Sequence, residues 1–418
     1  MNFFKVTFLS GLLTLLRLIC GFIISKIVAM YTGPSGVAAL GQLQSFVALI
    51  NGFVSSQVSQ GVTRYTAENN TNYFSAAKYW RAALRLSCIA GCLIITIGIL
   101  FSSRISTFLF LSHDYYWIII LALSVVPLNI CNSIILAVLN GTSNYKKYFL
   151  ANAISVFLFL ISMLLFVLVL GKTGALISAA LNNAIAGLYS LFIIKNEPWL
   201  KIEYWLGPID KDAYRNIRNY FYMGIIGALT GPISIIMVRN IISSYLSVDD
   251  AGYWQATLRI SEAYLAVLTT AMTVYYFPKT AIAKTKIEHL IILKKGITLI
   301  VPMAITLSAS IYFLREFILS ILFTNEFKVA QSLFLYQNIG DFLRIVSWLF
   351  ATILLAKGYF KLNAILEITF SLLFPTLTYI FINKYGFITP SLAYLVNYII
   401  YLTLVAFIYI WHIRRLPQ

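Results

Sequence analysis

Apolar segments long enough to cross a membrane recur along the whole chain, separated by short polar breaks. A membrane-spanning helix needs about 20 consecutive apolar residues, and about twelve segments have this length. They occupy residues 6–30, 36–60, 82–101, 115–140, 148–170, 174–194, 217–243, 251–277, 291–314, 330–356, 361–383 and 387–411. The pattern predicts an all-α integral membrane protein with about 12 transmembrane helices.

The composition indicates that lipid surrounds most of the protein. Of the 418 residues, 60% are hydrophobic and 11% are charged, whereas soluble domains have about 25% charged residues. The net charge of +17 arises from Lys and Arg in short loops, which favours contact with anionic membrane lipids. We therefore expect membrane lipids as partners and no nucleic acid.

The basic residues predict the orientation, because Lys and Arg accumulate in cytoplasmic loops. With the N-terminus inside, the outer loops carry Arg104, Lys172, Arg315, Lys328 and Lys384, and five further cations lie within spans. The other 21 of the 31 Lys and Arg residues, including Arg414 and Arg415, fall on the inner side. We expect a multi-pass protein of the bacterial inner (cytoplasmic) membrane with both termini in the cytoplasm.

The two halves of the chain look related. Gly36 and Gly252 each follow a short outer loop and lie 252 − 36 = 216 residues apart, and Gly141 and Gly358, which open basic loops, lie 217 apart. The duplication predicts two six-helix lobes, residues 1–205 and 206–418, around a central cavity.

Ionisable side chains at bilayer depth are the candidate site, because an isolated charge there costs about 3 kcal/mol or more. They are the expected substrate-binding cations Arg17, Lys26, Arg239, Arg259 and Arg344, and the acids Glu262, Asp341 and Glu367. The surplus of cations predicts a cationic cavity for an anionic substrate. The planar fork of arginine favours phosphate.

Local pairing is the alternative role for some of these groups. Arg259 and Glu262 stand three residues apart on one helix, as do Asp341 and Arg344, so each pair can interact locally. Structural pairing, substrate binding and ion coupling therefore stay open.

Helix irregularities are predicted at four places. Arg17 and Lys26 lie on opposite sides of a straight helix, and a bend at Gly21 would let both face one cavity. Gly231 with Pro232, Pro127 and Pro375 are expected to interrupt their spans.

The sequence offers no residues for a metal, a cofactor or covalent catalysis. The four cysteines lie in apolar segments and the three histidines are far from them. No phosphate-binding glycine loop, nucleophile elbow or zinc motif is present in the sequence. We expect a transporter without a cofactor rather than an enzyme.

Four sequence stretches carry a resemblance to a known family. They are LLRLICGFIISKIVAMYTGPSGVA, GVTRYTAE, GYWQATLRISEAYL and LYQNIGDFLRIVSWLFATILLAKG. The chain resembles the Wzx group of polysaccharide flippases, within the superfamily that includes the MATE drug exporters. The resemblance implies a MATE-like fold and translocation of an undecaprenyl-diphosphate-linked oligosaccharide from the cytoplasmic to the periplasmic leaflet by alternating access.

The resemblance also implies roles and partners. The expected glycan is an O-antigen repeat unit, with lipid III second. Arg17, Lys26 and Arg239 would bind the diphosphate, and Glu262 and Asp341 would hold Arg259 and Arg344 until substrate competes. Glu367 is the candidate protonatable coupling group, with H⁺ or Na⁺ as the ion. Polysaccharide polymerase and chain-length proteins are the protein partners considered.

Two other functions fit parts of the pattern. An ion-coupled exporter of small molecules or drugs would share the fold, although a cavity for cationic drugs should carry surplus acids. A membrane polysaccharide polymerase would share the lipid substrate, but its chemistry needs large outer loops, and the predicted outer loops are short.

Overall fold

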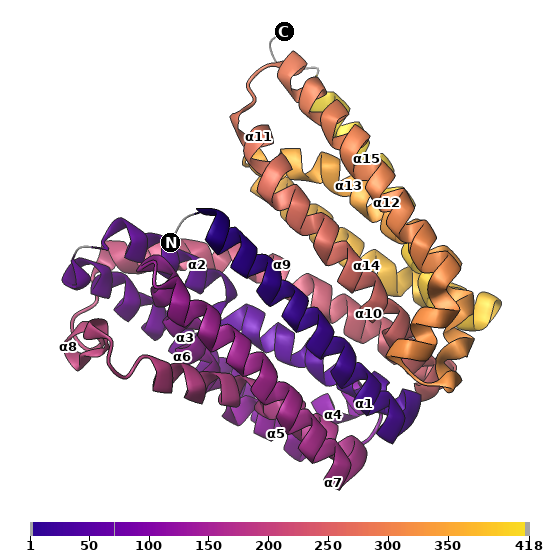
Figure 1. Ribbon diagram of the computed structural model, residues 1–418, viewed down its shortest axis with the longest axis horizontal. Coiled ribbons are helices and arrows are strands. Elements are labelled where there is room, and N and C mark those ends of the chain that lie inside the picture. The colour runs from indigo at the N-terminus through magenta and orange to yellow at the C-terminus, as the bar shows by residue number, and fades with distance from the viewer. Residues whose placement is uncertain (1–2, 71, 414–418) are drawn as a thin grey trace. The chain divides into compact units, whose positions relative to one another are not determined.

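The computed structural model describes residues 3–70 and 72–413, which form helices and no strands (Figure 1). Arg414 and Arg415 lie outside these described residues. The chain divides into two compact units, one containing the residues up to Thr32 and Ala39–Ile236, the other containing Gly33–Ala38 and the residues from Met237 onward.

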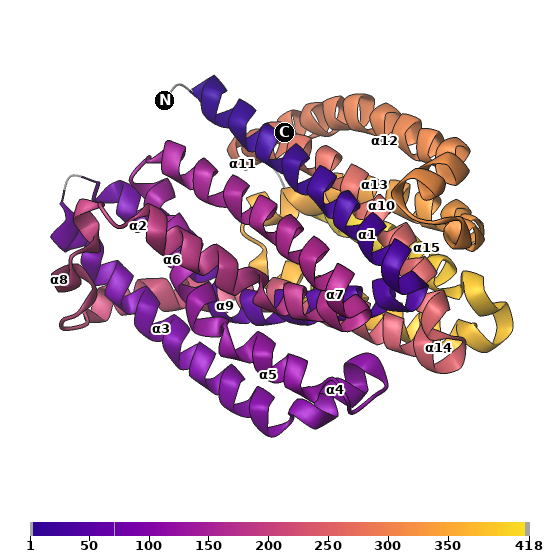
Figure 2. The ribbon, with the colours of Figure 1, turned by 60° about the horizontal axis from the view of Figure 1, so that its bottom comes forward.

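The first unit contains nine α-helices or parts of them. They are α1 (Phe3–Asn51), α2 (Gln57–Glu68), α3 (Tyr73–Leu100), α4 (Ser102–Phe110), α5 (Tyr116–Ser124), α6 (Val126–Gly141), α7 (Tyr145–Ile193), α8 (Ile202–Trp205) and the first part of α9 (Lys211–Tyr245). Within this unit α6 packs against α2 and α7, and α4 lies beside α5 (Figures 1 and 2).

The second unit contains the end of α9 and the helices that follow it. They are α10 (Val248–Ala271), α11 (Phe277–Ile282), α12 (Lys286–Leu322), α13 (Phe334–Ala356), α14 (Phe360–Tyr385) and α15 (Thr389–Ile413). Helix α13 packs against α10, α12 and α15. Tyr264, Leu349 and Tyr409 belong to the apolar core that joins these helices.

Eight helical runs among the described residues are long and apolar enough to cross a membrane. Three of them, Lys5–Ser55, Tyr145–Ile193 and Lys361–Trp411, contain about 50 residues each, which is enough for two spans. The eight runs can therefore hold eleven spans. Helix α10 has 24 residues but is not among these runs, so the twelfth span stays a prediction.

A glycine with positive φ divides each of the three long runs. Gly33, Gly171 and Gly386 have φ of 65°, 56° and 55°, a region that residues with a Cβ rarely adopt. Gly171 and Gly386 lie 386 − 171 = 215 residues apart. The π-helical segments Gly52–Ser56 and Met272–Tyr276 lie 272 − 52 = 220 residues apart. These matching irregularities support the duplication inferred from the sequence.

The boundary between the compact units lies inside α9, whereas the predicted lobes meet at residues 205 and 206. The beginning of α9 belongs to the first unit because two glycines allow close packing there. A Cβ on Gly52 would lie 2.6 Å from the Cβ of Ala228, and one on Gly224 would lie 1.4 Å from Cγ of Gln57. The lobe boundary at 205 and 206 stays a prediction.

The polar segment between the predicted lobes is anchored on α3. Trp80 is fully buried, its ring stacks on Trp205 at 5.3 Å between centroids, and Trp199 lies at its edge. Arg81 donates hydrogen bonds to the carbonyl oxygens of Glu203 and Tyr204. This segment therefore packs as part of the first unit.

Several predicted helix interruptions are corrected. The predicted bend at Gly21 is wrong, because α1 departs from helical dihedral angles only at Gly33. Pro232 and Pro375 lie inside α9 and α14, which continue through them; transmembrane helices tolerate proline where neighbouring groups satisfy the freed carbonyl. Pro127 does mark a break, at the start of α6.

Replacing Gly252 by alanine is expected to destabilise the protein by about 1–3 kcal/mol, as overpacking does in other proteins. A Cβ at Gly252 would lie 2.0 Å from the carbonyl oxygen of Pro34, and backbone cannot move aside as a side chain can. Gly11→Ala is the control, because nothing lies within 4 Å of a Cβ there. Thermal unfolding in detergent measures both variants, and equal midpoints would contradict this contact.

Candidate functional site

The eight titratable side chains selected from the sequence divide between the two units. Arg17 and Lys26 lie on α1 in the first unit. The second unit holds Arg239 on α9, Arg259 and Glu262 on α10, Asp341 and Arg344 on α13, and Glu367 on α14. The second unit therefore carries most of the candidate site.

Arg239 is a buried cation near the end of α9. Its side chain is 1% exposed, and its guanidinium donates a hydrogen bond to Oε1 of Gln255 on α10. The guanidinium also lies 5.9 Å from the centroid of the Trp254 ring. An amide oxygen and an aromatic face both stabilise the guanidinium as a cation.

Glu262 is the carboxylate around which the arginines gather. It interacts electrostatically with Arg344, Arg259 and Arg239. The pair Arg259 and Glu262, which the sequence suggested, is among these interactions. Arg344, which we expected to pair with Asp341, interacts electrostatically with both acids. Three helices thus bring three arginines near one acid.

Asp341 is fully buried and is surrounded by hydroxyl donors. Its carboxylate accepts hydrogen bonds from Tyr264 at 2.5 Å, from Tyr394 at 2.8 Å and from Ser261. A longer bond of 3.4 Å comes from the amide of Gln337. These donors come from α10, α13 and α15, so the carboxylate ties three helices of the second unit together.

Tyr394 connects Asp341 with Arg344. Nη1 of Arg344 donates to the hydroxyl of Tyr394 at 3.3 Å, and this hydroxyl donates to Oδ1 of Asp341. Rings of Trp348 and Tyr398 also lie 5.8 Å from the Arg344 guanidinium. The expected local pair of Asp341 and Arg344 is therefore linked through a tyrosine hydroxyl.

Glu367 lies apart from this arginine cluster in its hydrogen bonding. It is half-buried on α14 and accepts a hydrogen bond of 2.9 Å from the amide of Asn363, one turn earlier. Its helix carries no cation one turn away, and its hydrogen-bond donor is the neutral amide of Asn363. This environment is compatible with a carboxyl group that gains and loses a proton.

In the first unit, α1 presents its two cations in different directions. Arg17 donates a hydrogen bond of 2.5 Å to Oδ1 of Asn152 on α7, while Lys26 is half-buried nine residues further on. Nine residues of helix turn through about 900°, which places the side chains on opposite sides. Without the bend at Gly21, one helix face does not carry both cations.

Two polar residues of the second predicted span, Asn51 and Ser55, join helices. Oδ1 of Asn51 accepts hydrogen bonds from Asn129 at 2.6 Å and from Asn183 at 3.1 Å. The hydroxyl of Ser133 donates to Ser55 at 3.0 Å. This network lies in the first unit and holds α1, α6 and α7 together, as interhelical hydrogen bonds do in membrane proteins.

Chemically, the cluster of the second unit suits an anion with several oxygens. Arg239, Arg259 and Arg344 outnumber the acids Glu262 and Asp341 by one positive charge. Arginine forks form paired, charge-assisted hydrogen bonds with phosphate oxygens. Among the described residues, no group of His, Cys, Asp and Glu side chains could hold a metal ion.

Sequence reasoning missed the neutral partners of these charges. Gln255 and Trp254 lie in the stretch GYWQATLRISEAYL but were not assigned a role there. Tyr394 lies 50 residues from Arg344, and tyrosines are common in this chain. Only the packing of α15 on α13 identifies Tyr394 as a site residue.

The fold matches solved transporters over nearly the whole chain. An inward-facing multidrug resistance MATE family transporter of the MOP superfamily gives a TM-score of 0.79 at 14% identity, covering 94% of this chain and 95% of that chain. The lipid II flippase MurJ in an inward closed conformation gives 0.74 at 16% identity, covering 97% and 87%. The chain therefore has an all-helical, MATE-like fold.

The family follows from the sequence match. The model of the family described as Polysaccharide biosynthesis protein matches residues 3–281, and the chain belongs to this family. The Lipid III flippase of Escherichia coli (strain K12) is 23% identical over 420 residues, covering 99% of this chain and 100% of the relative. These matches confirm the resemblance to polysaccharide flippases of the MOP superfamily.

Proposed function

We propose that this protein translocates an oligosaccharide linked to undecaprenyl diphosphate from the cytoplasmic to the periplasmic leaflet of the bacterial inner membrane. Transport proceeds by alternating access, and both termini lie in the cytoplasm. The glycan is an O-antigen repeat unit or a lipid III-type oligosaccharide. The full-length likeness to a lipid III flippase supports a lipid-linked cargo.

The arginine cluster of the second unit is the observation that supports this proposal most strongly. Arg239 is buried with a neutral hydrogen-bond partner, and Arg344 is held by a tyrosine hydroxyl. Charges at bilayer depth persist where they serve transport. A diphosphate carries the negative charge that such a cluster favours, whereas a cationic drug would be repelled.

The proposed roles follow the geometry of each unit. Arg239, Arg259 and Arg344 bind the diphosphate, and Glu262 holds the arginines until the substrate displaces it. Arg17 and Lys26 provide a second cationic contact in the first unit. Glu367 is proposed as the group that binds H⁺ if transport is coupled to protons; Na⁺ is the alternative ion.

Two strains test the function, one lacking its O-antigen flippase and one lacking its lipid III flippase. The protein is expressed in both and the surface polysaccharide is measured. We expect restoration in at least one strain, and the strain that is rescued identifies the glycan. Purified protein in liposomes should move the same lipid-linked oligosaccharide across the bilayer, scored by access of a glycosidase added outside.

The opposite outcome would favour the drug exporter. Failure in both strains, together with lower susceptibility of the cells to cationic drugs, would overturn the proposed substrate. The fold would permit that activity, because the MATE transporter shares it.

A further inference from the structure

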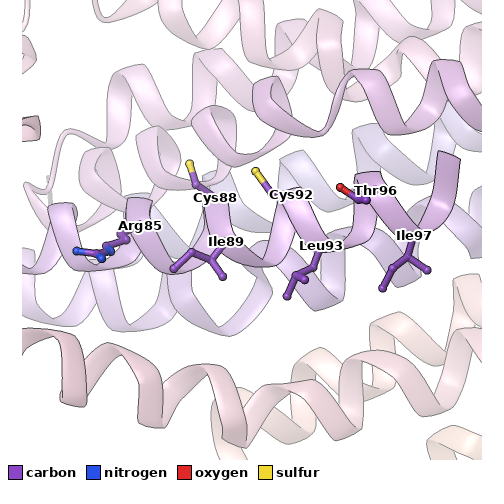
Figure 3. A pocket seen from close by; sticks show the side chains of 7 residues that line it. All are labelled: Arg85, Cys88, Ile89, Cys92, Leu93, Thr96 and Ile97. Atoms are coloured by element: carbon purple, nitrogen blue, oxygen red, sulfur yellow. The ribbon is translucent and has the colours of Figure 1, made fainter. Parts of the chain in front are cut away.

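A groove of about 460 Å³ follows the outer face of α3 in the first unit (Figure 3). Its lining consists of Arg85 followed by Cys88, Ile89, Cys92, Leu93, Thr96 and Ile97. Their spacing of three and four residues places them on one side of the helix. The lining is therefore apolar along most of its length and has a cation at one end.

The shape of the groove comes from side-chain size. Figure 3 shows these residues in two rows along α3, with Cys88, Cys92 and Thr96 in one row and Ile89, Leu93 and Ile97 in the next. The first row is short and the second is long and branched, so the second row forms a wall beside a shallow trough. Ile89, Leu93 and Ile97 are 46%, 54% and 55% exposed, so the described chain leaves this wall open.

The other face of α3 explains why this one stays open. Gly91 packs against Ile130 of α6, and Gly98 against Leu123 of α5, with fully buried alanines such as Ala83 on the same side. Small residues let α3 approach its neighbours closely. Along the groove, α3 therefore uses small residues for contacts with its neighbours and turns Ile89, Leu93 and Ile97 outward.

Arg85 differs from the other basic residues on α3. Lys78 lies 3.9 Å from the carboxylate of Asp210, and Arg81 donates to the carbonyl oxygens of Glu203 and Tyr204. Arg85 is exposed, and no hydrogen-bond or ion-pair partner is found for it among residues 3–70 and 72–413. Its charge is therefore available to a ligand at the end of the groove.

The length of the groove fits one leaflet of a bilayer. From Arg85 to Ile97 the helix rises about 18 Å, and one leaflet contributes about 15 Å of hydrocarbon. A lipid whose phosphate contacts Arg85 can therefore lay an acyl chain along the trough as far as the bilayer centre. One guanidinium also matches the single negative charge of a phosphodiester headgroup.

We propose that this groove binds an anionic phospholipid of the leaflet facing the basic end of α3, with the phosphate on Arg85 and an acyl chain along Cys88, Cys92 and Thr96. The site is independent of the proposed transport site, because its lining contains none of the transport residues. The long polyprenyl chain of the transport substrate is the competing occupant.

Native mass spectrometry of the full-length protein tests the headgroup contact, with phosphatidylglycerol and phosphatidylcholine added separately. Arg85→Gln is expected to weaken phosphatidylglycerol binding about fivefold, the effect of one basic side chain on affinity for anionic lipid. It should weaken phosphatidylcholine binding less, because the choline ammonium offsets the phosphate charge. Lys146→Gln, which removes an exposed cation of α7, should retain the wild-type preference.

A second arm tests the trough. Cys92→Phe keeps Arg85 and fills the groove, so it should lower the binding of both phospholipids. Phosphatidylglycerol with a photoreactive acyl chain should label the tryptic peptide 86–104.

Equal phosphatidylglycerol binding by wild type and Arg85→Gln would overturn the proposal. Labelling of this peptide by a photoreactive polyprenyl phosphate, and not by the phospholipid, would overturn it in favour of the substrate chain.

Discussion

Replacing Arg239 by glutamine is expected to lower the rate of lipid-linked oligosaccharide translocation by about 10- to 100-fold. This factor corresponds to the loss of one charge-assisted hydrogen bond of about 1.5–3 kcal/mol. Arg239 is 1% exposed, and its hydrogen bond to Gln255 and its contact with the Trp254 ring hold the guanidinium in place. The variant removes the charge while keeping a polar side chain. The liposome assay measures the rate at equal amounts of reconstituted protein.

Two further variants separate charge from folding at Arg239. Arg218→Gln removes an exposed cation from the same helix and should transport at the wild-type rate. Arg239→Lys keeps the charge but loses the planar fork, so an intermediate rate is expected. If Arg239→Gln transports as fast as Arg218→Gln while both have the wild-type thermal midpoint, Arg239 does not bind the substrate.

The sequence alone predicts the helical spans well, because bilayer thickness constrains them so strongly. The predicted span 361–383 is helix Phe360–Tyr385, and 387–411 is Thr389–Ile413 after a short turn. The largest deviation is at α3, predicted from residue 82 but beginning at Tyr73. Hydropathy detects only the apolar part of the helix, whereas Asn72 caps it ten residues before the predicted start. The polar first turns of α3 contain Trp80.

Helix breaks are predicted less well, because proline and glycine act through their surroundings. Pro127 lies at the start of α6, as expected, but Pro232 remains inside a continuous helix. Gly33 supplies the break in α1 that we expected at Gly21. Gly33 directly precedes Pro34 in a predicted outer loop, and its positive φ of 65° is one that glycine adopts without strain.

The charged residues of the candidate site are predictable, but their partners are not. A titratable group within an apolar segment is easy to recognise in a sequence, because placing a charge in the bilayer costs free energy. Arg239 and Asp341, found in this way, lie buried in the second unit. Which neutral groups satisfy them depends on tertiary packing. The cavity expected between the two lobes, and the part played in it by Arg17 and Lys26, stay predictions.

Replacing Asp341 by alanine is expected to destabilise the second unit by at least about 3 kcal/mol, because a buried donor without an acceptor costs about 1–3 kcal/mol. The variant leaves the hydroxyls of Ser261, Tyr264 and Tyr394 without their shared acceptor. These donors link α10 and α15 to α13, so the loss should loosen all three helices. The free energy of unfolding is measured by titration with denaturing detergent.

The variant Tyr394→Phe distinguishes this structural role from a role in transport. It keeps the ring and the Asp341 carboxylate, and removes only the hydroxyl. That hydroxyl accepts a hydrogen bond from Arg344 at 3.3 Å and donates one to Asp341 at 2.8 Å. A hydrogen bond to a charged group contributes about 1.5–3 kcal/mol, and the variant loses one of the three hydroxyl donors to Asp341, so it should be less destabilised than Asp341→Ala. A less ordered Arg344 should raise the substrate KM with little change in maximal rate. Tyr401→Phe, on the same helix and with its ring against Phe370, is the control for loss of a hydroxyl. If Tyr394→Phe has the same stability and the same KM as Tyr401→Phe, the Tyr394 hydroxyl does not position Arg344 for the substrate. Asp341 then has a structural role only.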